Sequence, residues 1–371
     1  MVIMALDHVR DYFHAEAMID DPTNLATTTP ILFFTRWITH FCAPTFIFLA
    51  GTSAFLSGEK RTKKELSVFL VTRGLWLILA EVIIVTFGWS FNPYFGTIIL
   101  QVIWAIGISM VLLSVFIWLP FPILLIIGLA IVFGHNILDF KEASEQNKLP
   151  MLWNILHRSA LIPISKMHSI LFFYAFPVWT GVMICGYCFG KLYRKGSDPL
   201  YRKRALVFLG IGAIVSFIVL RFINMYGDPS PWSFQKTTEL TVISFFNVSK
   251  YPPSLIYLLM TLGPSILLLR WFEKIQNKVS DFFIVFGRVP FFYYILHIFL
   301  IHILCVVAFF LSGYQLKDYA TGLFYFRPQK FGFVLLAVYG IWAGVVLLLY
   351  PLCKWYNNYK ATHNHWVFSY V

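Results

Sequence analysis

Long runs of apolar residues, separated by short polar connections, dominate the pattern along the 371-residue chain. A helix needs about 20 predominantly apolar residues to cross a bilayer. After a shorter apolar segment at the start of the chain, windows of that length predict apolar helices over residues 33–57, 66–88, 97–118, 121–139, 169–190, 205–223, 251–272, 281–311 and 332–353. Because the runs are continuous and do not alternate at every second residue, they are typical of transmembrane helices and not of a barrel.

The first apolar segment is shorter than the others. About 14 residues precede the first polar loop, and at about 1.5 Å per residue they reach roughly 21 Å of an about 30 Å hydrocarbon core. We therefore predict an all-α, polytopic transmembrane bundle of about ten spans in a single domain over residues 1–371, with the first span truncated at its N-terminal end.

Composition supports a membrane location and excludes other classes. Hydrophobic residues make up 59% of the chain and charged residues 12%, whereas soluble domains carry about 25% charged residues. This excludes a soluble enzyme and a disordered chain. The net charge of +12 does not indicate nucleic acid, since most basic residues in the connections follow the even-numbered spans, which predicts that these connections and the C-terminus are cytoplasmic. All five cysteines lie in or beside apolar segments, so no metal site is predicted.

The segment LDHVRDYFH concentrates ionisable residues in an apolar helix. Asp7, Arg10, Asp11 and His14 follow the i, i+3, i+4, i+7 spacing of one helix face, and His8 lies one position round. One interpretation is a self-neutralising ion-pair set at the outer interface, in which Arg10 extends to water. The other is a functional site, because ionisable groups within a bilayer are costly.

A second group of polar residues lies in the segment WITHFCAPTFIFLAG. Arg36, His40 and Pro44 share one helix face, which places His40 about 6 Å deeper than Arg36. Pro44 lacks a backbone donor, so we expect a kink that opens a polar lining. His40 either joins a site with the first helix or only bonds to a neighbouring helix.

Polar residues of later spans are Glu81, Gln101, His297 and His302. The two histidines are five residues apart and diverge by about 140°, so they are not expected to face the same site, whereas Tyr293 shares the face of His297. Glu81 is either part of a site or a paired or protonated core carboxyl.

Two arginines, Arg73 and Arg288, lie at helix ends predicted to be cytoplasmic. They either extend to lipid phosphates or hold an anionic cofactor by bidentate phosphate contacts.

Several segments resemble one family. The run MALDHVRDYFH, followed by an outer loop and RWITHFCAPTFIFLAGTSAFLSGEKR, resembles the start of the bacterial branch of the heparan-alpha-glucosaminide N-acetyltransferase catalytic-domain family. The runs ILQVIWAIGISM and FGRVPFFYYILH are similar to later helices of that family. Members begin with a stretch resembling IDxxRG, which this sequence lacks, in agreement with the short first segment.

The resemblance implies a transmembrane acyltransferase of the bacterial inner membrane. Acetyl-CoA approaches from the cytoplasm, and the acetyl group passes to an amino sugar or other acceptor on the outer side. In the eukaryotic relative, an asparagine at the end of the first helix and a histidine in the next loop form the catalytic pair. Asp7 and His8 match the asparagine's neighbourhood, and His14 or His40 would replace the loop histidine, because the outer loop after His14 contains none.

The chemistry of acyl transfer requires a base near the acceptor. We expect His8 or His40 to be that base and Asp7 to orient it, with His14 and His297 as further catalytic candidates. The two helix-end arginines would hold the CoA phosphates. A covalent acetyl-histidine and direct transfer both stay open.

A proton-coupled transporter or exporter is the alternative function, with the His, Asp and Glu residues as a proton relay. The two halves of the sequence show no pseudo-repeat, which many secondary transporters have. The intramembrane ionisable groups argue against a purely structural scaffold. Expected partners are the lipid bilayer, acyl-CoA, a small sugar-like acceptor and a second copy of the chain, but no nucleic acid.

Overall fold

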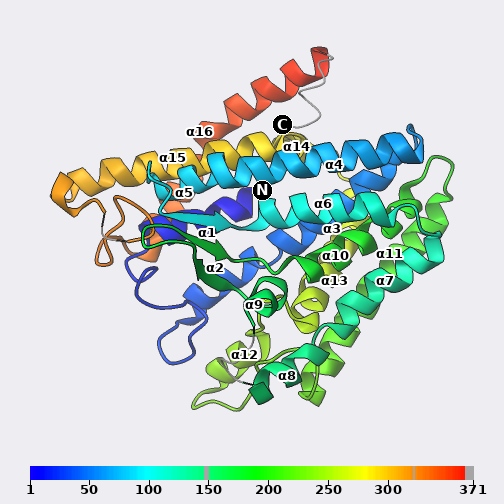
Figure 1. Ribbon diagram of the computed structural model, residues 1–371, viewed down its shortest axis with the longest axis horizontal. Coiled ribbons are helices and arrows are strands. Elements are labelled where there is room, and N and C mark those ends of the chain that lie inside the picture. The colour runs from blue at the N-terminus through cyan, green and yellow to red at the C-terminus, as the bar shows by residue number, and fades with distance from the viewer. Residues whose placement is uncertain (146–149, 321, 364–371) are drawn as a thin grey trace. The chain divides into compact units, whose positions relative to one another are not determined.

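The computed structural model describes residues 1–145, 150–320 and 322–363 (Figure 1). The chain divides into two compact units. The first consists of Met1–Cys42, Val82–Ile98 and Ile275–Val371, and the second of Ala43–Glu81 and Ile99–Lys274. Each unit is therefore built from segments that are far apart in the sequence.

Helices of the first unit come from both ends of the chain and from a short central segment. They are α1 (Val2–Phe13), α2 (Pro30–Thr39), α5 (Thr86–Ser90), α14 (Lys278–Arg288), α15 (Pro290–Leu311), the 3₁₀ turn η3 (Leu316–Asp318) and α16 (Leu335–Thr362). Helix α1 packs against α2, α15 and α16. Its first turn accepts a hydrogen bond from Trp342, whose indole Nε1 lies 2.9 Å from the Val2 carbonyl oxygen. At its end, Phe333 N donates to the Phe13 carbonyl at 2.7 Å.

The second unit holds the larger number of elements. Its helices are α3 (Cys42–Gly58, which begins at the unit boundary), α4 (Lys63–Ala80), α6 (Val102–Phe116), α7 (Phe121–Gly134), α8 (Ile137–Glu145), α9 (Met151–His157), α10 (Phe176–Phe189), η2 (Gly190–Tyr193), α11 (Pro199–Ile223), α12 (Thr238–Phe246) and α13 (Leu255–Phe272). Helices α11 and α13, and helices α4 and α6, form extensive pairs. Close approach of α4 and α6 depends on Gly74, because a Cβ there would lie 2.5 Å from the Gly107 carbonyl oxygen. A π-helical turn, η1 (Glu81–Val85), crosses the unit boundary.

Among the described residues, seven helical segments are long and apolar enough to cross a membrane. They are Pro30–Gly58, Lys63–Ser90, Phe121–Ser144, Pro199–Ile223, Leu255–Phe272, Pro290–Leu311 and Leu335–Thr362, and Val102–Phe116 is a shorter apolar helix. This confirms the predicted all-α polytopic membrane protein. The count of about ten spans stays a prediction.

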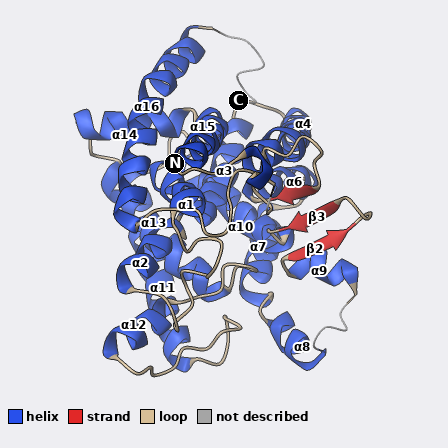
Figure 2. Ribbon diagram, turned by 90° about the vertical axis from the view of Figure 1, so that its left-hand side faces the viewer, coloured by secondary structure: helices blue, strands red, loops and turns tan. Residues whose placement is uncertain are grey.

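The described part of the chain contains three short strands, two of which lie in predicted helices. They are β1 (Thr97–Leu100), β2 (Ala160–Pro163) and β3 (Ser169–Phe172), in the order β1-β3-β2 (Figure 2). Strands β2 and β3 are antiparallel, with Ala160 opposite Phe172. The windows 97–118 and 169–190 were therefore wrong as continuous helices, since each begins with a strand. An apolar run alone does not distinguish a buried strand from the first turn of a helix.

The predicted helix over residues 281–311 is divided in two. Helix α14 ends at Arg288 and α15 begins at Pro290. Val289 between them has φ −129° and ψ 51°, since the residue before a proline is disfavoured in the α region and proline donates no backbone hydrogen bond.

Candidate active site

Two histidines from distant parts of the sequence contact each other in the first unit. His8 lies on α1 and His297 on α15, and His8 Nδ1 is 2.7 Å from His297 Nε2. Their rings are nearly parallel, with an interplanar angle of 13° and centroids 4.9 Å apart. His297 is fully buried, whereas His8 is partly exposed. His8 is thus the more accessible member of the pair.

Hydrogen bonding assigns the tautomers of the two rings. His297 Nδ1 lies 2.8 Å from the backbone carbonyl oxygen of Tyr293, which can only accept, so Nδ1 carries the proton. In a neutral His297 the lone pair is then on Nε2, which accepts from His8 Nδ1–H. A neutral His8 therefore carries its basic lone pair on Nε2.

Aromatic rings surround this histidine pair. The Tyr293 ring stacks on His297 with centroids 5.0 Å apart and an interplanar angle of 7°. The Trp89 ring meets His8 edge-on at 4.7 Å, and the Tyr294 ring does so at 6.2 Å. These contacts fix the planes of both imidazoles, as a catalytic histidine requires.

Asp7 belongs to an ion-pair set. Its carboxylate lies 3.1 Å from Arg10 Nη2 and forms a second, very short contact with Arg36 Nη1 of α2. Arg10 Nη2 also lies 2.6 Å from Asp11 Oδ1. The predicted self-neutralising set is therefore present, and Arg36 joins it from another helix. The structure pairs the Asp7 carboxylate with guanidinium groups, and its role as the partner that orients His8 stays a prediction.

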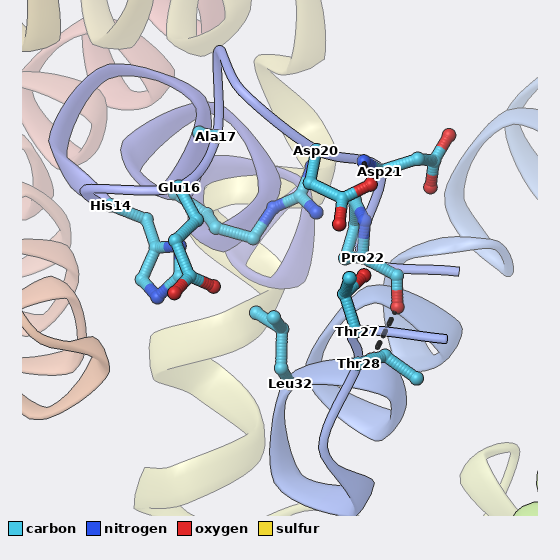
Figure 3. Close-up of a pocket in the computed structure, with 10 residues that line it drawn as sticks. His14, Glu16, Ala17, Asp20, Asp21, Pro22, Thr27, Thr28 and Leu32 are labelled. Atoms are coloured by element: carbon cyan, nitrogen blue, oxygen red, sulfur yellow. Dashed lines mark hydrogen bonds between the residues drawn. The ribbon is translucent and has the colours of Figure 1, made fainter. Parts of the chain in front are cut away.

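His14 follows the end of α1 and lines a small cavity with Arg10, Glu16, Asp20 and Leu32 (Figure 3). The cavity holds about 10 Å³, which is close to the space of a single water. The His14 carbonyl oxygen accepts from Arg327 Nη2 at 2.6 Å. Burial, opposed by Glu16, lowers the pKa of the His14 side chain, and the cations Arg10 and Arg327 lower that pKa further. A cavity of this size suits water and not an acceptor.

His40 lies at the predicted kink. Helix α2 ends at Thr39 and α3 begins at Cys42, so the break falls at His40 and Phe41. Pro44 has no N–H to donate to the carbonyl of His40, four residues earlier, which explains the break. The kink is confirmed. His40 is 2% exposed, and its catalytic role stays a prediction.

His302 faces different surroundings from His297, as the spacing predicts. Its Nδ1 lies 2.9 Å from the Gly88 carbonyl oxygen and 3.2 Å from the Tyr12 hydroxyl. Its Nε2 lies 2.8 Å from the Tyr325 carbonyl oxygen. These contacts join α1, α5 and the loop after α15, which is a structural role.

Two ionisable residues of the second unit bond to backbone groups. Fully buried Glu81 accepts from the backbone N–H of Gln101 at 2.6 Å, at the start of α6. Arg221 donates to four backbone carbonyls, at distances of 2.7 to 3.0 Å; they belong to Ser230, Ser244, Phe245 and Asn247. For Glu81 the structure thus favours a core carboxyl that caps a helix.

The two predicted phosphate-binding arginines fall in different units. Arg73 belongs to α4 of the second unit, where its guanidinium lies 5.8 Å from the centroid of the Phe69 ring. Arg288 is the exposed last residue of α14 in the first unit. A shared CoA site for these residues stays a prediction.

One group that the sequence did not indicate has the donors of a metal site. Asp139 and Glu142 of α8 and His157 of α9 offer ligand atoms within 4.8 Å of one another. Glu142, however, already accepts from Trp153, His157 and Arg158, each at 2.7 or 2.8 Å. The guanidinium of Arg158 neutralises this carboxylate, which favours a link between α8 and α9 over a cation site.

Comparisons with known proteins identify a family. The family model described as "Heparan-alpha-glucosaminide N-acetyltransferase, catalytic" matches residues 11–226, which is more than half of the chain. No curated protein and no solved structure matches the chain. His8 and His297 lie outside the matched range, so their pairing rests on the structure itself. With its apolar helices and this match, the chain belongs to the heparan-alpha-glucosaminide N-acetyltransferase catalytic-domain family as a membrane protein.

Proposed function

We propose that this membrane protein transfers an acetyl or other acyl group from cytoplasmic acyl-CoA to an amine or hydroxyl acceptor on the outer side, with His8 as the general base. The family match supports the reaction class. The observation that carries the role of His8 is its hydrogen bond to His297 Nε2 at 2.7 Å. This bond leaves the basic lone pair on His8 Nε2.

In the proposed reaction, one proton moves from the acceptor to His8 and then from His8 to the CoA sulfur. His8 Nε2 takes a proton from the acceptor, whose nitrogen or oxygen then attacks the thioester carbonyl carbon of acyl-CoA. A carbon–nitrogen or carbon–oxygen bond forms, the carbon–sulfur bond breaks, and the CoA sulfur leaves with the proton held by His8. His297 keeps the His8 ring in place through its own bond to the Tyr293 carbonyl.

The ion-pair set of Asp7, Arg10, Asp11 and Arg36 has a positioning role in this proposal. Asp7 precedes His8 directly in the sequence, and its contact with Arg36 joins α1 to α2. The set therefore fixes the rotation of α1, and with it the direction of the His8 ring.

The direction of transfer follows from the charged connections. Basic residues concentrated after the even-numbered predicted spans support a cytoplasmic C-terminus and cytoplasmic delivery of acyl-CoA in a bacterial inner membrane. Arg73 and Arg288 are proposed to contact its phosphates.

Replacement of single histidines tests the proposal. Purified protein in vesicles is given labelled acetyl-CoA outside and glucosamine inside, in the orientation that exposes the C-terminus, and acetyl-glucosamine is measured. His8→Ala should lower the rate by about 10²–10⁴-fold, the usual contribution of a general base. The exposed loop variant His168→Ala is the matched control and should keep full activity. Full activity of His8→Ala would remove His8 as the base, and failure to bind acetyl-CoA would instead favour a transporter.

A further inference from the structure

A groove runs along helix α11 of the second unit. It has a volume of about 640 Å³ and includes one residue of α13, Arg270. The lining residues from α11 are Leu200, Lys203, Arg204, Val207, Phe208, Ile211, Gly212 and Val215. The groove therefore combines three basic side chains with an apolar floor.

The spacing of these residues separates the charges from the apolar part. Lys203, Val207, Ile211 and Val215 follow one another at four-residue steps, so they form one row along the helix. The apolar part of the row, from Val207 to Val215, is about 12 Å long, and one leaflet of hydrocarbon is about 15 Å thick. The basic residues occupy the first turns of α11 and the last turn of α13. One end of the groove is thus cationic, and the apolar rest is long enough to contact most of an acyl chain within one leaflet.

Among the described residues, the three cations at this end form no ion pair with an acidic side chain. Neighbouring Arg202 forms an ion pair with Glu273 at 3.0 Å. In the described part of the chain, no salt bridge joins Lys203, Arg204 or Arg270 to a carboxylate. Their combined charge is consequently available to an anion.

Gly212 opens the apolar part of the groove. A Cβ at Gly212 would meet no atom within 4 Å, whereas a Cβ at Gly210 would lie 2.6 Å from the Leu267 side chain. Gly210 therefore packs against α13, and Gly212 contributes space. Phe208 beside it is 78% exposed and forms a wall of the groove.

We propose that this groove binds one anionic phospholipid, independently of the acyltransfer reaction. The lipid phosphate contacts Lys203, Arg204 and Arg270, and one acyl chain follows the row to Val215. Bulk lipid needs only an apolar helix surface, but three unneutralised cations beside a concave apolar row select lipids with an anionic headgroup. Free phosphate would use the cations alone, and a second copy of the chain would use the apolar row alone.

Lipid binding to the full chain in detergent tests the proposal. Affinities for phosphatidylglycerol, phosphatidylcholine and inorganic phosphate are measured by native mass spectrometry. Phosphatidylglycerol should bind more tightly than either of the others. The triple variant Lys203→Gln, Arg204→Gln, Arg270→Gln should lose about a hundredfold in phosphatidylglycerol affinity, about fivefold for each basic residue. The control triple Lys60→Gln, Lys64→Gln, Lys195→Gln removes the same charge from exposed positions and should keep the affinity. Equal losses in both triples, or none in the first, would overturn the proposal.

A second variant tests the acyl part without changing charge. Gly212→Phe should fill the groove and weaken phosphatidylglycerol binding at least tenfold, whereas Gly340→Phe, also at a position with no atom within 4 Å, should leave binding unchanged. Unchanged phosphatidylglycerol binding in Gly212→Phe, full competition by inorganic phosphate, or dissociation of a dimer by this variant would overturn the lipid proposal.

Discussion

Two sets of buried ionisable residues, one in each unit, have partners of different kinds. In the first unit, side chains of α1 contact side chains of other helices: His8 contacts His297 of α15, and Asp7 contacts Arg36 of α2. In the second unit, Glu81 and Arg221 bond to backbone N–H and carbonyl groups. Both arrangements remove the cost of an unsatisfied group in a membrane.

This difference distinguishes contacts that can support proton transfer from contacts that only stabilise the fold. A backbone carbonyl or N–H cannot change its protonation, so the bonds of Arg221 and Glu81 to backbone groups hold segments together but offer no second group that could take a proton. Two adjacent imidazoles can exchange a proton with a substrate and with each other. The partner of an intramembrane ionisable residue is thus a better guide to its function than its location in the membrane alone.

The largest expected effect concerns stability in the second unit. Arg221→Met leaves four carbonyls without their buried donor, and should lower the free energy of unfolding by about 3–5 kcal/mol. Thermal unfolding in detergent measures this loss. Lys64→Met, at an exposed position of α4 outside the proposed lipid groove, serves as the control. A loss below about 1 kcal/mol would show that the carbonyls find other donors.

A smaller effect is expected for His297 in the first unit. His297→Ala removes the acceptor of His8 Nδ1–H and should lower the acetyl-transfer rate about 10–100-fold, with a changed pH profile. His302→Ala tests whether any buried histidine of α15 has this effect. The pH profile of acetyl transfer by folded His302→Ala protein should match that of the unchanged protein. Identical pH profiles for His297→Ala and the unchanged protein would exclude the positioning role.

The ion-pair set should contribute less to the acetyl-transfer rate than His297 does. Arg36→Gln weakens the link between α1 and α2 and should reduce the rate about tenfold, with partial rescue by Arg36→Lys. The rates at saturating and at low acceptor are compared. A change in KM alone would place Arg36 in acceptor binding instead of in the positioning of His8.

The smallest expected effect is the pH dependence from His14. Its pKa is lowered in the folded protein, so the unfolded chain binds more protons and acid favours unfolding. This contribution is present above pH 6.5 and is lost as the pH falls through the folded pKa. Between pH 7 and pH 5 the change should stay below about 1 kcal/mol, and His14→Gln should remove it. A steeper acid dependence in His14→Gln would contradict the sign.

Sequence patterns predicted what lies along one helix. They indicated the apolar helices, the stripe of Asp7, Arg10 and Asp11, the kink before Pro44, and the divergence of His297 from His302. Each of these follows from helical spacing or from the missing donor of proline.

Those patterns did not predict the contacts between different helices. His8 and His297 are separated by 289 positions, and spacing gives the face of a helix but not its neighbour. For the same reason, helical spacing did not indicate that Asp7 pairs with Arg36 of α2. The break at Val289 and the strands that begin at residues 97 and 169 were missed because the prediction followed continuous apolar runs. Such runs do not show where a helix breaks or where a strand begins.

The double replacement of His8 and His297 tests the central claim most directly. If the two rings act as one unit, His8→Ala and the double variant should lose acetyl transfer to the same extent, because His297 acts only through His8. Losses that multiply in the double variant would show that the two histidines act independently, and would contradict this account.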